Sequence, residues 1–328
     1  MIVLGIESTA HTFSVSIING KEKKVLSNVI KGFTTESGGM IPSKVADHHV
    51  DNFDSILKES LKKANIKLKD VELISFSQGP GMGHSLRIGA FVAKNLSLKL
   101  KKPLIGVNHC IAHLEIGRML TAAKDPVLLY ASGANTQIIA YEAGKYRVFG
   151  ETLDNGIGNF IDSFARELGL GFPGGPKVYE LSLLGKNYIE LPYVVKGMDV
   201  SFGGLLTNLK QKLQQGHSKE DLCYSVQETV YAMLIEVAER AMAHTGKTEL
   251  LLGGGVACNK RLQAMAKEMC DARGAKCFTL ENQFNVDNAA MIAWLGYVMY
   301  NAGNKTTLSN SQIRPYERTD DVKVNWRT

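Results

Sequence analysis

Two histidines four residues apart, His109 and His113, have the spacing in this chain that most directly suggests chemistry. They begin an amphipathic stretch after a short apolar run. On a helix they share one face, so both imidazoles can reach a single metal ion about 2.0–2.1 Å away. A zinc protease with this spacing also needs a glutamate directly after the first histidine, and Cys110 stands there. The sequence therefore excludes that protease and leaves either another metal site or two histidines that only pack or face solvent.

Three glycine-rich turns each follow a strand-like apolar run. Residues 253–259 precede a helical pattern, where glycines let the backbone approach a ligand and the helix N-terminus favours an anion. Residues 131–137 form a hairpin turn whose backbone N–H groups can hold phosphate, and residues 5–10 repeat this arrangement. None of the turns matches the dinucleotide fingerprint or the P-loop. One such turn alone is more often structural, but three together predict a nucleotide site.

Length and composition set the outer bounds of the interpretation. A chain of 328 residues with 45% hydrophobic content can bury a large core and divide into two lobes. No apolar run approaches about 18 residues and no charged region precedes the first strand, so a cytoplasmic protein without a membrane segment is expected. The five cysteines form no CxxC pair, which predicts reduced thiols. A net charge of +6 suits RNA, although lysine-rich proteins that bind no nucleic acid also carry it.

The elements that must position these residues follow one order twice. The periodicity predicts strands near 2–6, 12–18 and 25–30, then a helix at 44–63, a strand at 72–77, a helix at 85–99, a strand at 104–107 and the histidine helix at 109–122. It then predicts strands near 127–131, 136–141 and 146–152, a helix at 157–168, a Gly/Pro-rich excursion at 170–217, and a helix at 219–244. A strand at 249–252, a helix at 258–272, a strand at 276–279 and a helix at 286–300 complete the second series.

Two βββαβαβα units in tandem indicate a structural duplication. This α/β arrangement is the actin-like ATPase (ASKHA) fold, in which the nucleotide lies between two lobes. We expect an N-terminal lobe at 1–126 and a C-terminal lobe at 127–289 with the insertion 170–217. We expect the segment 290–328 to pack back on the N-terminal lobe.

The order of motifs along nearly the whole chain resembles the universal family of tRNA threonylcarbamoyladenosine synthases, the TsaD-like enzymes. The motifs that carry the resemblance are 5–12, 79–81 with 86–89, 108–113, 132–137, 154–158 with Asp162, 174–176, 199–202, 253–259, 287–290 and 318–320. The Glu-Ser-Thr-Ala-His form of the first loop is similar to the archaeal and eukaryotic branch, which works in the KEOPS complex. The chain departs from the family pattern at Ala134 and Gly203, and at Ile41, Ser43 and Lys44 around Pro42.

The resemblance implies transfer of a threonylcarbamoyl group from threonylcarbamoyl-AMP to N6 of the adenosine 3′ of a tRNA anticodon. It implies one divalent metal, Fe²⁺ rather than Zn²⁺ by preference, bound by His109, His113, Asp287 and, as fourth ligand, Tyr130. Asp287 has an alternative role as the N-cap of the following helix. Glu7 is the candidate for orienting substrate or a water. The residues expected to hold the adenine nucleotide are Tyr130, Ala131, Ser132, Gly133, Ala134, Gly158, Asp162, Gly175, Tyr179, Gly254, Gly255 and Asn259. For Asp162 the alternative is a solvated helix carboxylate.

Two other functions fit the same fold: a small-molecule kinase, which needs a carboxylate base near its acceptor hydroxyl, and a chaperone-like ATPase, which needs a separate substrate domain. The basic residues are dispersed in short groups such as Lys62-Lys63, so tRNA alone should bind weakly and with strong salt dependence. The resemblance therefore implies KEOPS-type partners: a small atypical kinase, a small dimer-forming subunit and a tRNA-end-binding subunit. The helices near 44–63 and 109–122 are the expected docking surface for the dimer-forming subunit.

Overall fold

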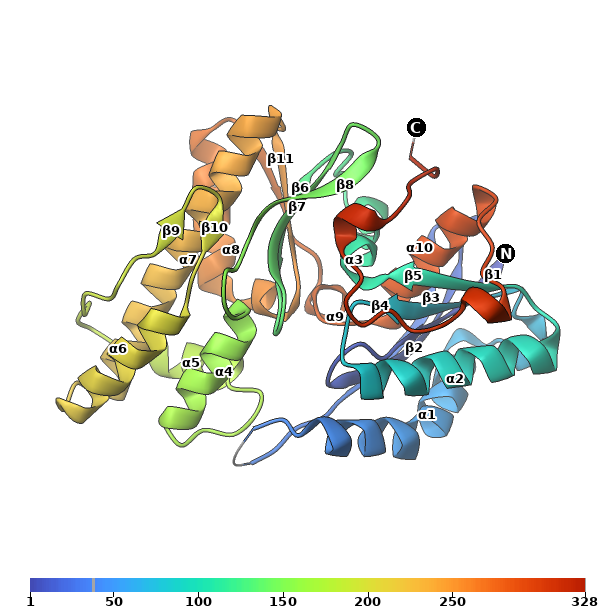
Figure 1. Cartoon of the computed structure of the whole chain (residues 1–328), viewed down its shortest axis with the longest axis horizontal. Coiled ribbons are helices and arrows are strands. Elements are labelled where there is room, and N and C mark those ends of the chain that lie inside the picture. Colours follow the sequence, from blue (N-terminus) through green and yellow to red (C-terminus); the bar gives the residue numbers. More distant parts are fainter. Residues whose placement is uncertain (37–38, 328) are drawn as a thin grey trace.

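The computed structural model describes residues 1–36 and 39–327, and they form two series of elements in the predicted order (Figure 1). The first series consists of β1 (Ile2–Glu7), β2 (Thr12–Asn19), β3 (Lys24–Gly32), α1 (Pro42–Ala64), β4 (Leu73–Gly79), α2 (Gly83–Leu100), β5 (Leu104–Asn108) and α3 (His109–Leu120). The second begins with β6 (Val127–Ala131), β7 (Thr136–Glu142), β8 (Lys145–Glu151) and α4 (Ile157–Glu167), and continues after the insertion with α7 (Lys219–Thr245), β11 (Glu249–Gly253), α8 (Lys260–Ala272), β12 (Lys276–Phe278), α9 (Asn282–Asn285) and α10 (Ala289–Asn301). Short 3₁₀ turns lie at Leu68–Asp70, Gly255–Cys258, Leu308–Asn310 and Thr319–Asp321.

The two main sheets have the same topology. The first has the strand order β3-β2-β1-β4-β5 and the second β8-β7-β6-β11-β12. In each, the first strand pairs antiparallel with the second and parallel with the fourth. The central strands β1 and β6 are almost entirely buried, which is why they read as continuous apolar runs. The predicted duplication and the actin-like α/β fold are confirmed.

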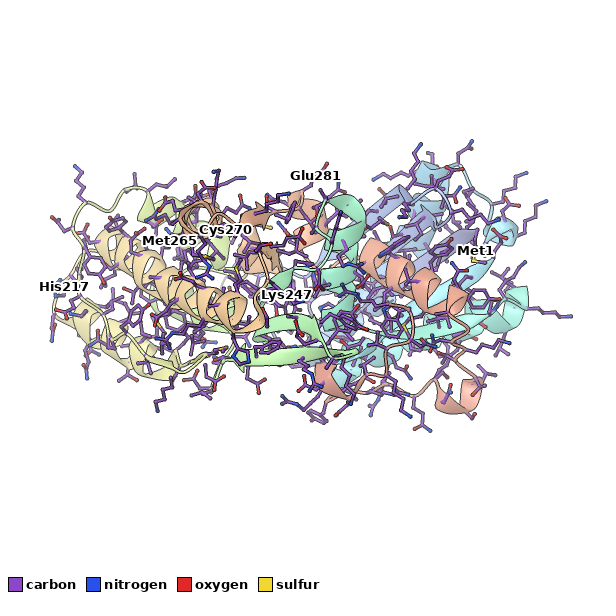
Figure 2. The ribbon with its side chains drawn as sticks, turned by 90° about the horizontal axis from the view of Figure 1, so that it is seen from above. Met1, His217, Lys247, Met265, Cys270 and Glu281 are labelled. Carbon is purple, nitrogen blue, oxygen red and sulfur yellow. The ribbon has the colours of Figure 1, made fainter. Side chains whose placement is uncertain are left out.

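Helices from both series fill the space between the sheets. Helices α1 and α2 pack on the first sheet, and α10 packs on β1, β2 and β4 of the same sheet although it follows the second sheet in the chain. Helix α3 contacts α10 on one side and β11 on the other, so the two form a middle layer, while α7 packs against β6 and β7 (Figure 1). Viewed from above, Met1 and His217 lie toward opposite ends of the long axis (Figure 2). The lobe boundaries at 126 and 289 stay a prediction.

Helix α10 can lie close to β1 because the strand has a glycine at the contact. A Cβ atom on Gly5 would stand 2.2 Å from the carbonyl oxygen of Ala289 and 2.8 Å from the backbone nitrogen of Ala293. Both are backbone atoms and cannot turn away as a side chain could. Gly5 therefore fixes the position from which α10 starts.

The boundaries differ from the prediction in the second series. The helix expected at 258–272 begins at Lys260, after the 3₁₀ turn at Gly255–Cys258. The helix expected at 286–300 is α10, which begins at Ala289, and the short helix α9 before it was not predicted. The excursion 170–217 contains α5 (Gly175–Ser182), α6 (Gly203–Gln214) and the short strand pair β9 (Val195–Lys196) and β10 (Asp199–Val200). None of the helices among residues 1–36 and 39–327 is long and apolar enough to cross a membrane.

Asp154 ties this insertion to the β8–α4 connection. Its carboxylate accepts hydrogen bonds from the backbone N–H groups of Phe202 at 3.0 Å and Gly203 at 2.7 Å, at the start of α6, and from the Ser201 hydroxyl at 2.6 Å. Partial burial would raise the pKa of Asp154, but these hydrogen bonds lower it to about 2. A Cβ atom on Gly203 would lie 2.9 Å from the carboxylate, so glycine at this departure from the family pattern leaves the contact room.

Residues 303–327, here called the C-terminal strap, cross from the first sheet to the second. Along the first sheet, the backbone N–H of Arg314 donates to the Gln78 carbonyl at 2.7 Å. At the second, Asp320 Oδ1 accepts from the Val148 N–H at 2.8 Å, and the Arg327 guanidinium lies 4.3 Å from the centre of the Tyr141 ring. In Figure 1 the strap is the red segment that follows α10 toward the end labelled C. It thus connects the two sheets independently of the middle helices.

Candidate metal and nucleotide site

The two histidines sit at the start of α3, directly where β5 ends. Asn108 caps the helix, because its Oδ1 accepts a hydrogen bond from the Ile111 N–H at 3.1 Å. The predicted helix is confirmed, and its geometry places His109 and His113 one turn apart on the same face, with ring centres 4.9 Å apart. Both side chains are buried.

Asp287 and Tyr130 converge on the same pair of imidazoles. Asp287 Oδ1 lies 3.3 Å from His109 Nε2 and 3.4 Å from His113 Nε2, and the Tyr130 hydroxyl lies 2.9 Å from His109 Nε2. Ligands about 2.0–2.1 Å from one ion at tetrahedral angles would lie about 3.3–3.4 Å from each other. The distances from the Asp287 oxygen to each of the two histidine nitrogens therefore fit one ion.

The alternative role for Asp287 as a helix cap is wrong. Asn288 is the N-cap of α10, and its Oδ1 accepts from the Met291 N–H at 3.1 Å. Asp287 lies one residue earlier, in the connection after α9, and its carboxylate points at the histidines. The Asp287 carboxylate therefore contacts the histidines and does not cap a helix.

The electrostatics of the cluster favour a cation. Both ring nitrogens of His113 are buried without a hydrogen-bond partner among the described residues, and burial lowers the pKa of this histidine, so its neutral form is favoured. Burial would raise the pKa of Asp287, but His109 and His113 hold it well below its ordinary range. A carboxylate, two imidazoles and a buried phenol form a nitrogen and oxygen donor set that suits Fe²⁺ or Zn²⁺.

Glu7 lies behind the cluster, against the other nitrogen of His109. Its Oε2 is 2.9 Å from His109 Nδ1, and its Oε1 accepts a hydrogen bond from the Thr9 N–H at 2.6 Å. The Thr9 hydroxyl is 3.2 Å from the same Nδ1. A proton on Nδ1 that donates to Glu7 leaves Nε2 free as an acceptor, which is the orientation a metal ligand needs. Sequence reasoning missed Thr9, although it lies two residues after Glu7 in the first glycine-rich turn.

The predicted nucleotide-binding residues of the second sheet come from loops that touch. The Gly158 N–H donates to the Ser132 carbonyl at 3.0 Å, and a Cβ atom on Gly158 would stand 2.7 Å from the Cα of Gly133. Gly254 has a φ of +92°, and a Cβ atom there would stand 2.3 Å from the Ala131 carbonyl oxygen. The β6–β7 hairpin, with Ala134 outside the positive-φ region, therefore lies between the other two loops. A Cβ atom on Gly175 or Gly255, in contrast, would meet no atom within 4 Å among the described residues other than its own neighbours in the chain.

Asp162 and Tyr179, two further predicted nucleotide-binding residues, lie on the helices α4 and α5. Asp162 Oδ1 accepts a hydrogen bond from the Gly174 N–H at 2.7 Å, and burial raises the pKa of its carboxyl. The alternative of a solvated helix carboxylate is therefore wrong. Tyr179 lies on α5, one turn after Gly175, and is half-buried.

Asn259 has a structural role that the sequence interpretation did not include. It is the N-cap of α8, with Oδ1 accepting from the Arg261 N–H at 2.8 Å, and its Nδ2 donates to Gln227 Oε1 at 2.6 Å. Both ends of the amide are therefore bonded within the protein. Its proposed contact with nucleotide stays a prediction.

Solved structures with low sequence identity share the fold. HypF of T. kodakarensis superposes with a TM-score of 0.64 at 13% identity, covering 92% of this chain and 48% of that one. The activator of the 2-hydroxyisocaproyl-CoA dehydratase of Clostridium difficile, solved with bound ADPNP, has a TM-score of 0.56 at 10% identity and is covered over 99% of its length, with 94% of this chain. These likenesses concern the fold alone.

Sequence relatives are much closer. The family model TsaD, described as tRNA N6-adenosine threonylcarbamoyltransferase, matches residues 24–294. The tRNA N6-adenosine threonylcarbamoyltransferase of Thermococcus kodakarensis is 53% identical over 327 residues, which is 99% of this chain and 100% of that protein. The probable bifunctional tRNA threonylcarbamoyladenosine biosynthesis protein of Methanosarcina mazei is 52% identical over 99% of this chain, which spans 59% of that longer protein. With this identity over nearly its full length, the chain belongs to the TsaD family of tRNA N6-adenosine threonylcarbamoyltransferases.

Proposed function

We propose that this protein transfers a threonylcarbamoyl group from threonylcarbamoyl-AMP to N6 of the adenosine 3′ of the anticodon in tRNA. The observation that carries the proposal is the convergence of His109, His113 and Asp287 beside glycine-rich loops, in a chain that belongs to this family. The kinase alternative lacks its base at this position, because the Glu7 carboxylate is already engaged by Thr9 and His109. The family assignment gives the chaperone-like alternative no support.

The reaction joins the adenosine N6 to the carbamoyl carbon and breaks the bond from that carbon to the phosphate oxygen, so AMP leaves and N6 loses one proton. An aromatic amine is a poor nucleophile, so catalysis depends on alignment and on polarising the acyl carbonyl. A divalent metal held by His109, His113, Asp287 and Tyr130 supplies Lewis-acid polarisation when bound. Glu7 and Thr9 fix the His109 ring. In this proposal the 131–134 hairpin, Gly158, Asp162, Gly175, Tyr179, Gly254, Gly255 and Asn259 hold the adenylate.

The proposed partners are tRNA and KEOPS-type subunits, namely a small kinase, a dimer-forming subunit and a tRNA-end binder. Within the helix expected at 109–122 as part of the docking surface, the residues from His109 to Gly117 are buried, so this helix offers little surface to a partner. Helix α1 keeps an exposed face that includes Val50, 49% exposed. The dimer-forming subunit is therefore proposed to dock on α1.

A reconstitution tests both the activity and the partner requirement. Purified protein, chemically or enzymatically prepared threonylcarbamoyl-AMP and unmodified tRNA are combined with and without the partner subunits, and tRNA nucleosides are measured by mass spectrometry. We expect modified adenosine only with tRNA and adenylate, and about tenfold or more product with partners, because scattered charges bind tRNA weakly. No product in any arm would refute the transfer, and an undiminished rate by this chain alone would refute the partner requirement.

The nucleotide role of Asn259 can be separated from its role as a helix cap. Asn259→Ala should bind AMP or ATP several-fold more weakly by calorimetry and also lose about 1 kcal/mol of unfolding free energy through the lost cap. Asn259→Ser keeps a capping oxygen, so it should recover stability without recovering nucleotide affinity. Ser218→Ala removes the comparable cap of α7, where Ser218 accepts from the Asp221 N–H at 3.0 Å, and should leave nucleotide affinity unchanged. Equal nucleotide affinities of Asn259→Ala and the unaltered protein would show that Asn259 does not contact the nucleotide.

A further inference from the structure

The C-terminal strap carries a tyrosine that is almost fully exposed. Tyr316 is 94% exposed, the largest exposure among the large hydrophobic side chains of the described residues, and it stands between the half-exposed Arg314 and Arg318. Building on the proposed function, we propose that Tyr316 is a stacking surface for an unpaired base of the substrate RNA, with the neighbouring arginines facing its phosphates. Exposed aromatic rings beside basic side chains are how proteins commonly bind single-stranded nucleic acid.

The backbone that carries Tyr316 is anchored on both sides. The carbonyl of Pro315 accepts from the Gly81 N–H at 3.1 Å, and the carboxylate of Glu317 accepts from Asn108 Nδ2 at 3.1 Å. A Cβ atom on Gly79 would stand 1.9 Å from the Arg314 carbonyl oxygen, so the strap lies directly on the end of β4. The ring is thus held out to solvent by an ordered segment. A preorganised ring loses little conformational entropy when a base stacks on it.

The same anchors connect the backbone around Tyr316 to the cluster of His109, His113 and Asp287. Asn108, which binds Glu317, directly precedes His109 in the chain. On the other side, Gly81 binds Pro315, and the next residue, Met82, donates its N–H to the Thr9 carbonyl at 2.7 Å. The Thr9 hydroxyl is itself 3.2 Å from His109. The two residues that flank Tyr316 are therefore both connected to the site, Glu317 through Asn108 and Pro315 through Gly81, Met82 and Thr9.

The charges around Tyr316 suit an RNA strand. Arg314 pairs with Glu317 at 2.7 Å and Arg318 with Glu151 at 3.3 Å, but a guanidinium has five N–H donors, so both retain donors for phosphate. The first turns of α2, which lie against Pro315, add exposed His84 and Arg87. The target adenosine lies in a single-stranded loop, so its neighbours offer unpaired bases. An aromatic face with flanking arginines beside the reactive site matches such a loop.

Binding of a fluorescent anticodon stem-loop RNA to the full chain tests this inference directly. We expect Tyr316→Ala to raise the Kd for the stem-loop by roughly five- to tenfold. The KM for tRNA in the reconstituted reaction should rise by a similar factor. Tyr316→Phe and Tyr316→Trp should retain binding, because they keep an aromatic face. Leu308 is 51% exposed on the same strap, and Leu308→Ala should leave the Kd and the KM unchanged. AMP affinity and metal content should stay unchanged in all four variants.

The outcomes separate this inference from the proposed function. Unchanged Kd and KM in Tyr316→Ala would overturn the stacking surface while the transfer activity stands. Absence of transfer by the unaltered protein, with stem-loop binding still sensitive to Tyr316, would overturn the proposed function and leave the RNA contact. Loss of activity only when partner subunits are present, with unchanged RNA binding, would assign Tyr316 to a protein contact and refute the RNA contact.

Discussion

His113→Ala and His109→Ala should each lower the divalent metal bound per chain to well below one equivalent while the fold persists. Two of the donor atoms come from α3, and both lie 3.3–3.4 Å from Asp287 Oδ1. Loss of either histidine therefore removes one metal ligand. Replacing groups that only support metal ligands already costs about 10- to 100-fold in affinity, so loss of a ligand should cost more. Transfer activity should fall in parallel.

Elemental analysis of the purified variants, with circular dichroism and thermal unfolding for the fold, measures this effect. His217→Ala is the matched control, because His217 is exposed and lies at the far end of the molecule from Met1 (Figure 2). Glu7→Gln adds an intermediate case, since the amide can still accept from His109 Nδ1 but carries no charge. Full metal occupancy in both histidine variants would show that the cluster does not bind the metal.

Gly5→Ala is the second change for which we expect a large effect. The new methyl group would meet the Ala289 carbonyl oxygen at 2.2 Å and the Ala293 nitrogen at 2.8 Å, and both belong to the backbone of α10. Overpacking a core costs about 1–3 kcal/mol when side chains can adjust, so a contact with rigid backbone should cost at least the upper value. Asp287 precedes Ala289 by two residues, so a displaced α10 should also weaken metal binding.

Denaturant unfolding and metal titration of Gly5→Ala measure the two consequences separately. Gly204→Ala is the matched control, because a Cβ atom at that exposed helix position meets no atom of residues 1–36 and 39–327 within 4 Å beyond its own helix, and alanine favours the helix. If Gly5→Ala unfolds at the same denaturant concentration as the unaltered protein and keeps its metal affinity, then α10 is not held in place by this close approach.

Elements with a clear period could be predicted from the sequence, whereas the burial of α3 could not. Most strands and helices lie within a few residues of their expected bounds, because alternation and 3.6-residue periodicity are local properties. Helix α3 carries Glu115 and Arg118, which indicate a solvent-exposed face. In the structure Glu115 is buried, where it binds Arg118 at 2.8 Å and the Tyr146 hydroxyl. Such compensation involves residues distant in sequence, and a local pattern does not contain it.

The candidate site divides in the same way. The spacing of His109 and His113 on one helix face could be predicted from the sequence alone. Asp287 and Asn288 are adjacent, and either can cap a helix, so only coordinates show which side chain turns toward the histidines. The sequence interpretation gave Asn259 only a role in nucleotide binding, and the structure shows that it also caps α8. Glu7 and His109 are 102 residues apart in the sequence, so no local pattern predicts their contact. The family resemblance identifies both residues as candidates but does not show that they touch.

The position of α10 on β1, β2 and β4 also has a consequence for how the chain reaches this state. The first sheet is complete in sequence once β5 has emerged, but the helix that covers one of its faces comes about 180 residues later. At synthesis rates of about 5–20 residues per second, that face waits on the order of ten to forty seconds. During translation it presents apolar surface to chaperones and to other nascent chains. The core that contains β1 is therefore complete only after α10, the last α-helix among the described residues, has been synthesised. Folding of the first series thus depends on synthesis of the second.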